Sequence, residues 1–394
     1  MNGLPGVSIA SERHPILRHL VSLGPRVADE DSEREAAVYV ASVLRDLGLE
    51  TQLDPFTFVG WRQTTPARVT VDAPLSLELQ SAAMAYTAST PPEGVTGELQ
   101  RIGTSYILPG VVEWPVYAVV DEHGLEVAYV LRRVGGRAYP VPNTYPHPAL
   151  MTVAVNIGDA DADQIDEWLA NDEVVQVTVV TAGERVPGLV SNNVIARLPG
   201  RTDDEIIVSS HLDTAPGSPG ADDNASGTQG LYDIAARLVA DGPLEKTVTF
   251  VAFGAEEYGM LGSFRYVANR KTRGSLGAVR ANINLDAIGA GEALWCYVAP
   301  DSLRTLVENE LARSRASDLF SSITFAETKR SVDAYPFHAE GIPNVSFIGW
   351  PYDDYHQPTD DLALIDHDMV DYLTTISYAL TRSLGETDPA WLTM

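Results

Sequence analysis

The chain has 394 residues, 45% of them hydrophobic and 21% charged, which is the composition of a globular protein that buries a substantial core. Its formal net charge of -27 argues against nucleic-acid binding, because a phosphate backbone selects for basic surfaces. No apolar run approaches the roughly 20 residues needed to span a bilayer, and residues 1–15 lack a signal-peptide pattern, so we expect a cytoplasmic protein without a membrane role. The single cysteine, Cys296, excludes an internal disulfide and a cysteine-based zinc cluster.

The length exceeds the usual size of one domain, which predicts a main domain with an addition. Near the start, Val40, Val43, Leu44 and Leu47 recur at helical spacing and Gly48 follows them, so we expect an amphipathic helix that ends there. From 75 to 188, short β-rich runs alternate with stretches rich in proline and glycine. This texture predicts an inserted β-rich domain, with residues 1–74 and 189–394 forming one discontinuous domain around it.

After residue 188 a regular alternation of strands and helices begins. We expect strands at 206–208, 248–253, 281–285 and 345–348. The clearest helix between them carries Leu231, Ile234, Ala235 and Leu238 on one face. The alternation predicts an α/β domain of three layers, αβα, with a central, mostly parallel mixed sheet.

Residues that bind metals recur where these expected strands end. His211 follows the first strand, Glu256-Glu257 the second, Asp286 the third, and Tyr355-His356 the fourth, while Asp222-Asp223-Asn224 lies in a separate loop. Two histidines and three carboxylates make a ligand set that suits zinc and tolerates manganese or cobalt. Each segment alone also fits a structural role, as a hydrogen-bonded strand end, a solvated turn or a helix cap.

Taken together, these segments resemble peptidase family M28, a family of zinc peptidases. The resemblance is carried, in the family's order, by His211-Leu212-Asp213, 220–227, 254–259, Asn284-Leu285-Asp286 and 356–360. It implies two zinc ions bridged by Asp223, with Asp222 not a ligand and the Asp223–Asn224 peptide bond cis. It also implies His211 and Asp286 as further ligands of one ion, and Glu257 and His356 of the other.

The same resemblance gives roles to residues around the metals. It implies Glu256 as the general base, and Tyr355 either as the hydroxyl donor to the oxyanion or as an aromatic wall. Asp213 would orient the ring of His211, as outer carboxylates do for metal-bound histidines. Asp360 matches a second acidic position, although it could equally cap a loop.

The chain departs from the family's pattern at Gln357, where threonine is usual, and in one segment near the expected substrate pocket. The segment 331–337 differs from the usual sequence at the substrate pocket, so side-chain specificity cannot be transferred, although we assign Arg330, Asp333, Phe337 and Trp350 to that pocket. The inserted region resembles a protease-associated domain. One hypothesis is that it covers the active-site entrance and favours short peptides; the other is that it is a stabilising or oligomer-forming appendage.

Several functions remain open on this scaffold. An acidic cavity suits a free α-amino group, so we favour an aminopeptidase that acts on peptides with a free N-terminus. A carboxypeptidase would need an arginine such as Arg265 or Arg330 to bind the terminal carboxylate, and a dipeptidase is a further variant. A glutaminyl cyclase, a transferase with one zinc, and a non-catalytic binding homologue are the alternatives outside the peptidases. The sequence does not indicate the oligomeric state.

Overall fold

The computed structural model describes residues 13–108, 112–133, 136–140, 152–314 and 318–387. Within them the strands form one continuous hydrogen-bonded sheet, in the order β13-β12-β14-β11-β9-β10-β8-β4-β5-β6-β7-β3. Its centre is parallel and consists of β9 (Thr202–His211), β10 (Lys246–Phe253), β11 (Val279–Leu285) and β14 (Asn344–Trp350). Beyond β14 lie the antiparallel β12 (Ala293–Ala299) and then β13 (Ile323–Ala326). The four predicted strands are therefore present, and the sheet is mixed as predicted.

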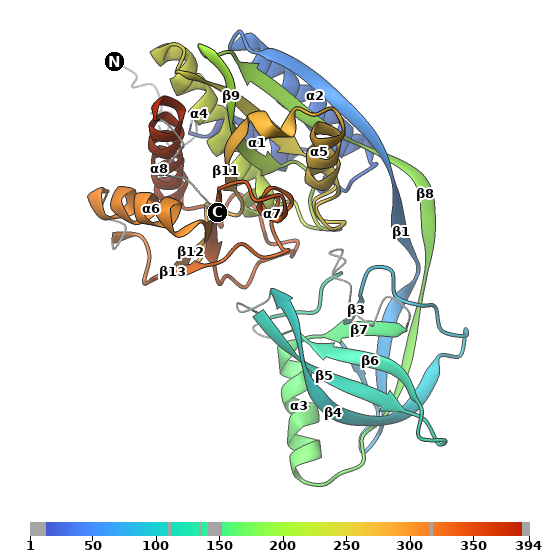
Figure 1. Cartoon of the computed structure of the whole chain (residues 1–394). Helices are drawn as coiled ribbons and strands as arrows, with labels where there is room; N and C mark the ends of the chain where they lie inside the picture. The colour runs from blue at the N-terminus through green and yellow to red at the C-terminus, as the bar shows by residue number, and fades with distance from the viewer. Residues whose placement is uncertain (1–12, 109–111, 134–135, 141–151, 315–317, 388–394) are drawn as a thin grey trace, which may run out of the picture.

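Helices cover both faces of this central sheet, which gives the predicted three layers (Figure 1). One face carries α1 (Pro15–Ser22), α2 (Asp31–Asp46), α4 (Gly227–Asp241), α6 (Asp301–Arg313) and α8 (His367–Glu386), whose apolar side chains form the main core. The other face carries α5 (Leu261–Thr272) and α7 (Tyr335–Ala339) around a smaller core. The predicted stripe on α4 is fully buried, since all four of its residues have no exposed surface. None of the described helices is long and apolar enough to cross a membrane.

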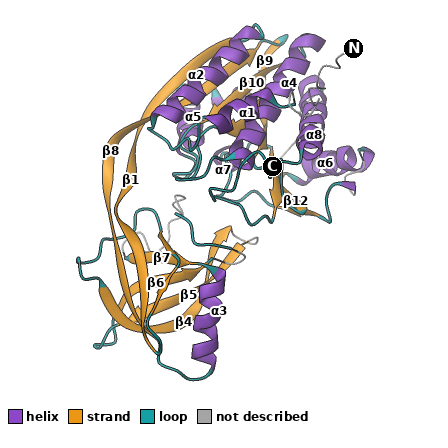
Figure 2. Cartoon of the chain, turned by 180° about the vertical axis from the view of Figure 1, so that it is seen from behind, coloured by secondary structure: helices purple, strands orange, loops and turns teal. Residues whose placement is uncertain are grey.

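A second lobe is attached through a two-stranded ribbon, which Figure 2 shows from behind. The ribbon consists of β1 (Glu50–Ala73) and β8 (Gln176–Leu198), antiparallel partners from Glu50↔Arg197 to Ala73↔Gln176. The lobe contains β2 (Leu77–Leu79), β3 (Ser81–Ala83), β4 (Val95–Leu108), β5 (Val112–Val120), β6 (Glu126–Arg132) and β7 (Val153–Ile157). It has an apolar core of its own, to which α3 (Asp159–Ala170) contributes.

The ribbon bears on the predicted division of the chain. The predicted boundary at 74 falls directly after β1, whereas the boundary at 188 falls inside β8. The ribbon strands pair from one end to the other with four register shifts, so the sheet passes from one lobe to the other. The helix α3 was not predicted, because the sequence pattern there was interpreted as β-rich. The division into domains therefore stays a proposal.

The helix predicted near the start of the chain is present. It is α2, which ends at Asp46, and Gly48 directly beyond its last turn has a φ of 89°.

Candidate metal centre

The fold brings the predicted site residues to one edge of the sheet. His211 is the last residue of β9, Asp286 directly follows β11, and Glu257 follows β10. Because these strands are parallel, their carboxyl ends meet at the same edge. The backbone is strained there, since Ala255, Ala287 and His356 have φ values of 52°, 53° and 57°. Strain of this kind persists where the surrounding structure fixes it and is typical of functional sites.

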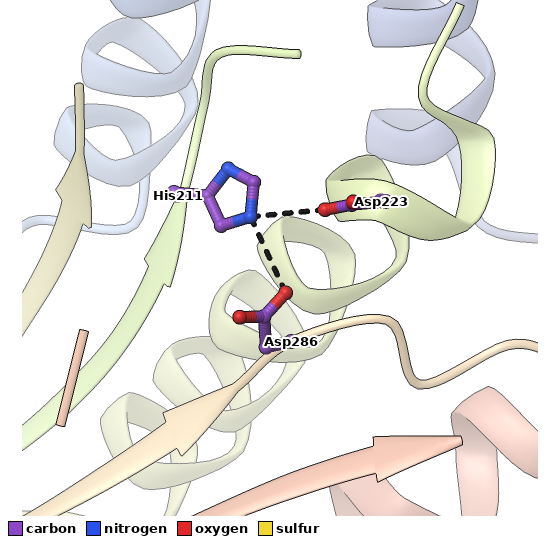
Figure 3. A group of neighbouring side chains, drawn as sticks. All are labelled: His211, Asp223 and Asp286. Carbon is purple, nitrogen blue, oxygen red and sulfur yellow. Dashed lines mark hydrogen bonds and ion pairs between the residues drawn. The ribbon is translucent and has the colours of Figure 1, made fainter. Parts of the chain in front are cut away.

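One group of ligand atoms gathers around His211 (Figure 3). Its Nε2 atom lies 3.0 Å from Oδ1 of Asp223 and 3.3 Å from Oδ1 of Asp286. The three potential ligand atoms lie within 4.8 Å of one another, and all three side chains are buried. One histidine and two carboxylates at this spacing could hold a divalent metal ion.

A second group gathers around His356. Its Nε2 atom lies 3.1 Å from Oδ2 of Asp223 and 3.2 Å from Oε2 of Glu257. These atoms also lie within 4.8 Å of one another. Asp223 therefore belongs to both groups and presents one carboxylate oxygen to each histidine, as a bridging ligand would.

Comparison with known proteins agrees with this geometry. The model of peptidase family M28 matches residues 193–381, which include all five predicted ligands. This part of the chain belongs to peptidase family M28. The chain is 27% identical to the aminopeptidase YwaD of Bacillus subtilis over 364 residues, covering 86% of this chain and 77% of YwaD.

Solved structures share the fold of the whole peptidase. An aminopeptidase from Aneurinibacillus sp. strain AM-1 superposes with a TM-score of 0.70 at 24% identity, covering 96% of this chain and 94% of the other. BSAP, described as a zinc aminopeptidase from Bacillus subtilis, superposes with a TM-score of 0.69 at 21% identity, covering 100% and 99%. Peptides are the substrates that the family implies.

In the peptidase, hydrogen bonds fix the turn that carries Asp223. The main-chain N–H groups of Asp222 and Asp223 donate to the two carboxylate oxygens of Asp360, at 2.7 and 3.2 Å. Asp222 turns away and accepts a hydrogen bond from the N–H of Gly289 at 2.6 Å. The Asp223–Asn224 bond is cis, as predicted. The carboxylate of Asp360 thus orients Asp223 by holding its backbone.

The role of Asp213 differs in detail from the prediction. Its carboxylate accepts hydrogen bonds from the N–H groups of Glu256 and Glu257, at 2.9 and 3.1 Å. The ring of His211 is oriented by the main-chain carbonyl of Asp213, which lies 3.1 Å from Nδ1, whereas the carboxylate lies 3.8 Å away. Asp213 therefore positions a histidine and two glutamates at once.

Burial and charge shift the acid–base behaviour of the cluster. Burial raises the pKa of the Glu256 carboxyl well above its usual range, and Asp333 and Glu257 add to the rise although His211 opposes it. Burial alone would raise the pKa of Asp223, yet its hydrogen bonds to the two histidines hold that pKa below the usual value. Burial would lower the pKa of His356, but Glu257 and Asp223 raise it to about 9. Several buried carboxylates at close range favour a bound cation, whose charge would compensate theirs.

The residues assigned to the substrate pocket lie in different surroundings. Asp333 is fully buried, and burial raises its pKa to about 8 despite the opposing His211. Trp350 ends β14 and packs at 90° against Tyr355, with ring centroids 5.1 Å apart. Phe337 lies in the core beneath the sheet, and the exposed Arg330 covers the ring of Phe264, so the structure does not bring these two into the cluster.

Two supporting residues were missed in the sequence. The side chain of Asn224 donates to the carbonyl of Leu285 at 2.9 Å and accepts from the N–H of Gly227 at 2.9 Å, which ties the turn to the strand before Asp286. The fully buried Arg26 donates to carbonyls of loops around the site, including those of Leu212 and Gly220. Asn224 lies inside the motif at 220–227, whereas no local pattern distinguishes Arg26.

Proposed function

We propose that this peptidase is a two-zinc aminopeptidase that removes residues from the N-terminus of peptides. The single observation that carries the proposal is the carboxylate of Asp223, which offers one oxygen to the group of His211 and the other to the group of His356. The zinc aminopeptidase BSAP supports the choice of metal. The mixed nitrogen and oxygen donors also suit manganese or cobalt as substitutes.

The donor set fits zinc without further ligands from elsewhere. Asp286 would complete the ligands of one ion, and Glu257 those of the other. Zinc bound there supplies a Lewis acid for the peptide carbonyl and lowers the pKa of a coordinated water towards about 7. No serine or cysteine nucleophile is needed for this chemistry.

Glu256 is the proposed general base. Its backbone is fixed by Asp213, and its buried Oε1 atom has no hydrogen-bond partner among the described residues. Its carboxylate accepts a proton from the attacking water and transfers it to the leaving amine. Positioned bases of this kind typically contribute about 10²–10⁴-fold to the rate.

Tyr355 is the proposed donor to the oxyanion. Burial raises the pKa of its hydroxyl well above the usual value, and the carboxylates of Asp223, Glu257 and Glu256 add to the rise. The phenol therefore keeps its proton at neutral pH and can donate a hydrogen bond to developing negative charge. A ring that also stacks on His356 can hold this hydroxyl in place.

The choice of an aminopeptidase rests on the buried carboxyl groups beside the ligand groups. The buried oxygens of Asp333 and Oε1 of Glu256 have no hydrogen-bond partner among the described residues, so they can accept hydrogen bonds from a protonated α-amino group, whereas a terminal carboxylate has no proton to donate to them. Arg330, one of the arginines considered for a carboxypeptidase, is exposed on Phe264 and outside the cluster.

A panel of peptides blocked at either end tests this proposal. N-acetylation is expected to abolish cleavage, because it removes the charged amino group, while C-amidation should leave kcat/KM within a few fold. The opposite pattern would identify a carboxypeptidase. Zinc content measured on the same preparation should be two ions per chain; one ion together with release of ammonia from an N-terminal glutamine would indicate a cyclase instead.

A further inference from the structure

The second lobe contacts the loop that carries His356. The guanidinium of Arg133 donates to the carbonyl of Asp353 at 3.4 Å, and the side chain of Gln357 donates to the carbonyl of Arg137 at 3.3 Å. These contacts lie on either side of His356 in the sequence. The loop is thus tied to the segment between β6 and β7 of the second lobe.

An aromatic side chain of that segment packs directly on the histidine. The ring of Tyr139 stands at 89° to the ring of His356, with centroids 5.1 Å apart. Tyr355 stacks on His356 at 3.7 Å and 24°, and the rings of Tyr139 and Tyr355 also pack on each other, with centroids 6.0 Å apart. The imidazole of His356 therefore contacts one ring from each lobe, and Tyr139 is only 3% exposed.

The two histidines of the metal centre differ in how they are oriented. The Nδ1 atom of His211 is anchored by the carbonyl of Asp213, the usual arrangement for a ligating histidine. The Nδ1 atom of His356 is buried and has no hydrogen-bond partner within the described part of the chain. Besides the contacts of its Nε2 atom with Asp223 and Glu257, ring packing is accordingly what orients His356.

The second lobe holds Tyr139 rigidly. The buried amide of Asn156 donates to the carbonyl of Tyr139 at 2.9 Å and accepts from its N–H at 3.1 Å. The amide of Gln80 makes the same pair of bonds with Ala138, at 3.0 and 2.7 Å. The ring itself packs at 81° against the buried Trp114.

We propose that the second lobe completes the metal centre. Tyr139 is a positioning residue that orients the ring of His356 toward the ion that Asp223, Glu257 and His356 would bind. The inference rests on the proposed function, because it takes His356 to be a ligand. It makes the lobe a working part of the active site and not an appendage.

Zinc binding to the metal-stripped full chain, measured by chelator competition, tests the role of Tyr139. In Tyr139→Ala one of two zinc ions should bind about 10–100-fold more weakly, the usual effect of losing an outer partner of a ligating histidine. The other ion should bind as in the wild type, and kcat should recover at excess zinc. Tyr139→Phe keeps the ring and should restore the affinity that the alanine variant loses.

Leu99→Ala is the matched control. Leu99 is buried in the apolar core of the second lobe and does not belong to the cluster that contains Trp114 and Tyr139. The Leu99→Ala variant should leave both zinc affinities near the wild type; equal weakening in this variant would show that general loosening of the lobe is the cause, which overturns the proposal. A Tyr139→Phe variant that keeps zinc but loses activity would also overturn the proposal, because the hydroxyl would then act on the substrate. A wild-type chain that binds no zinc, or a Glu257→Gln variant that binds it unchanged, would instead refute the proposed function.

Discussion

Neighbouring residues of the same type have different surroundings in this site. Oε2 of Glu257 lies 3.2 Å from Nε2 of His356, inside one of the two ligand groups. Glu256 belongs to neither group, although both backbones are held by Asp213. The two glutamates have the same side chain. They differ in the direction in which the side chain leaves the turn, and this separates the proposed base Glu256 from the proposed ligand Glu257.

Conservative variants of the two glutamates should therefore behave differently. Glu256→Gln removes the proton acceptor and keeps the shape, so zinc content should stay at the wild-type value while kcat falls by about 10²–10⁴-fold. Glu257→Gln removes a charged ligand, so one zinc ion should be lost or bound weakly, and activity should partly return with excess zinc. Metal analysis and steady-state kinetics measure both effects; loss of zinc from the Glu256 variant alone would exchange the two roles.

Another buried glutamate predicts how stability depends on pH. Burial raises the pKa of Glu33 from 4.5 to about 8, although the hydroxyl of Ser191 donates to it. Below pH 4.5 both the folded and the unfolded chain hold the proton. Between pH 4.5 and 8 the unfolded chain releases it while the folded chain keeps it, so the free energy of unfolding falls as pH rises, by up to roughly 1.4 kcal/mol per unit.

Glu33→Gln removes this titration and should flatten that part of the pH profile. Denaturant unfolding at pH 5 and pH 8, at constant zinc, gives the difference between wild type and variant, in which the pH dependence of metal binding cancels. The exposed neighbour Glu35 provides the control, and Glu35→Gln should follow the wild type. A parallel pH response of the Glu33 variant and the wild type would show that Glu33 is ionised in the folded protein.

At the scale of elements, periodicity was sufficient for the regular parts of the fold. The stripe on α4 and the apolar runs of β9, β10, β11 and β14 predicted elements that the structure contains, because burial against a sheet imposes those patterns. The three layers followed from the alternation of these elements. In the second lobe, α3 was missed because a short helix beside irregular strands carries a weaker pattern.

The site was predictable only as far as local motifs reach. Each predicted ligand belongs to a short motif, which follows a strand for four of them and lies in the turn before α4 for Asp223, and the structure brings all five together. Arg26, Asn156 and Tyr139 act through contacts with residues distant in sequence, such as Gly220 and His356, so no local pattern marks them. Phe337 shows the converse, because a motif position placed it in the pocket while packing places it in the core.

At the scale of the molecule, the ribbon of β1 and β8 connects the two lobes, so its packing determines whether each lobe can fold without the other. Near the helices, Phe56 and Phe58 of β1 pack against Ala28, Ala255 and Tyr258, so this half of the ribbon belongs to the peptidase lobe. Farther along, Val69 and Val71 are buried in the core of the second lobe. Between these halves, Arg62 and Glu184 face each other across the two strands.

This register offers a clean place to remove the second lobe. Replacing residues 63–183 by Asn-Gly joins Arg62 to Glu184 through the two-residue turn that antiparallel strands prefer. The shortened chain should fold, because the apolar face of the ribbon that packs on the peptidase lobe is kept, and circular dichroism should show the helical signal of the remaining lobe.

The shortened chain should bind one zinc ion as the full chain does and the other as weakly as the Tyr139→Ala variant. Excess zinc should then restore only part of kcat/KM, since the contacts to the loop of His356 are lost as well. Failure to fold would show that the two lobes share their stability through the continuous sheet; wild-type zinc binding and turnover would show that the lobe is an appendage, against the role inferred for Tyr139.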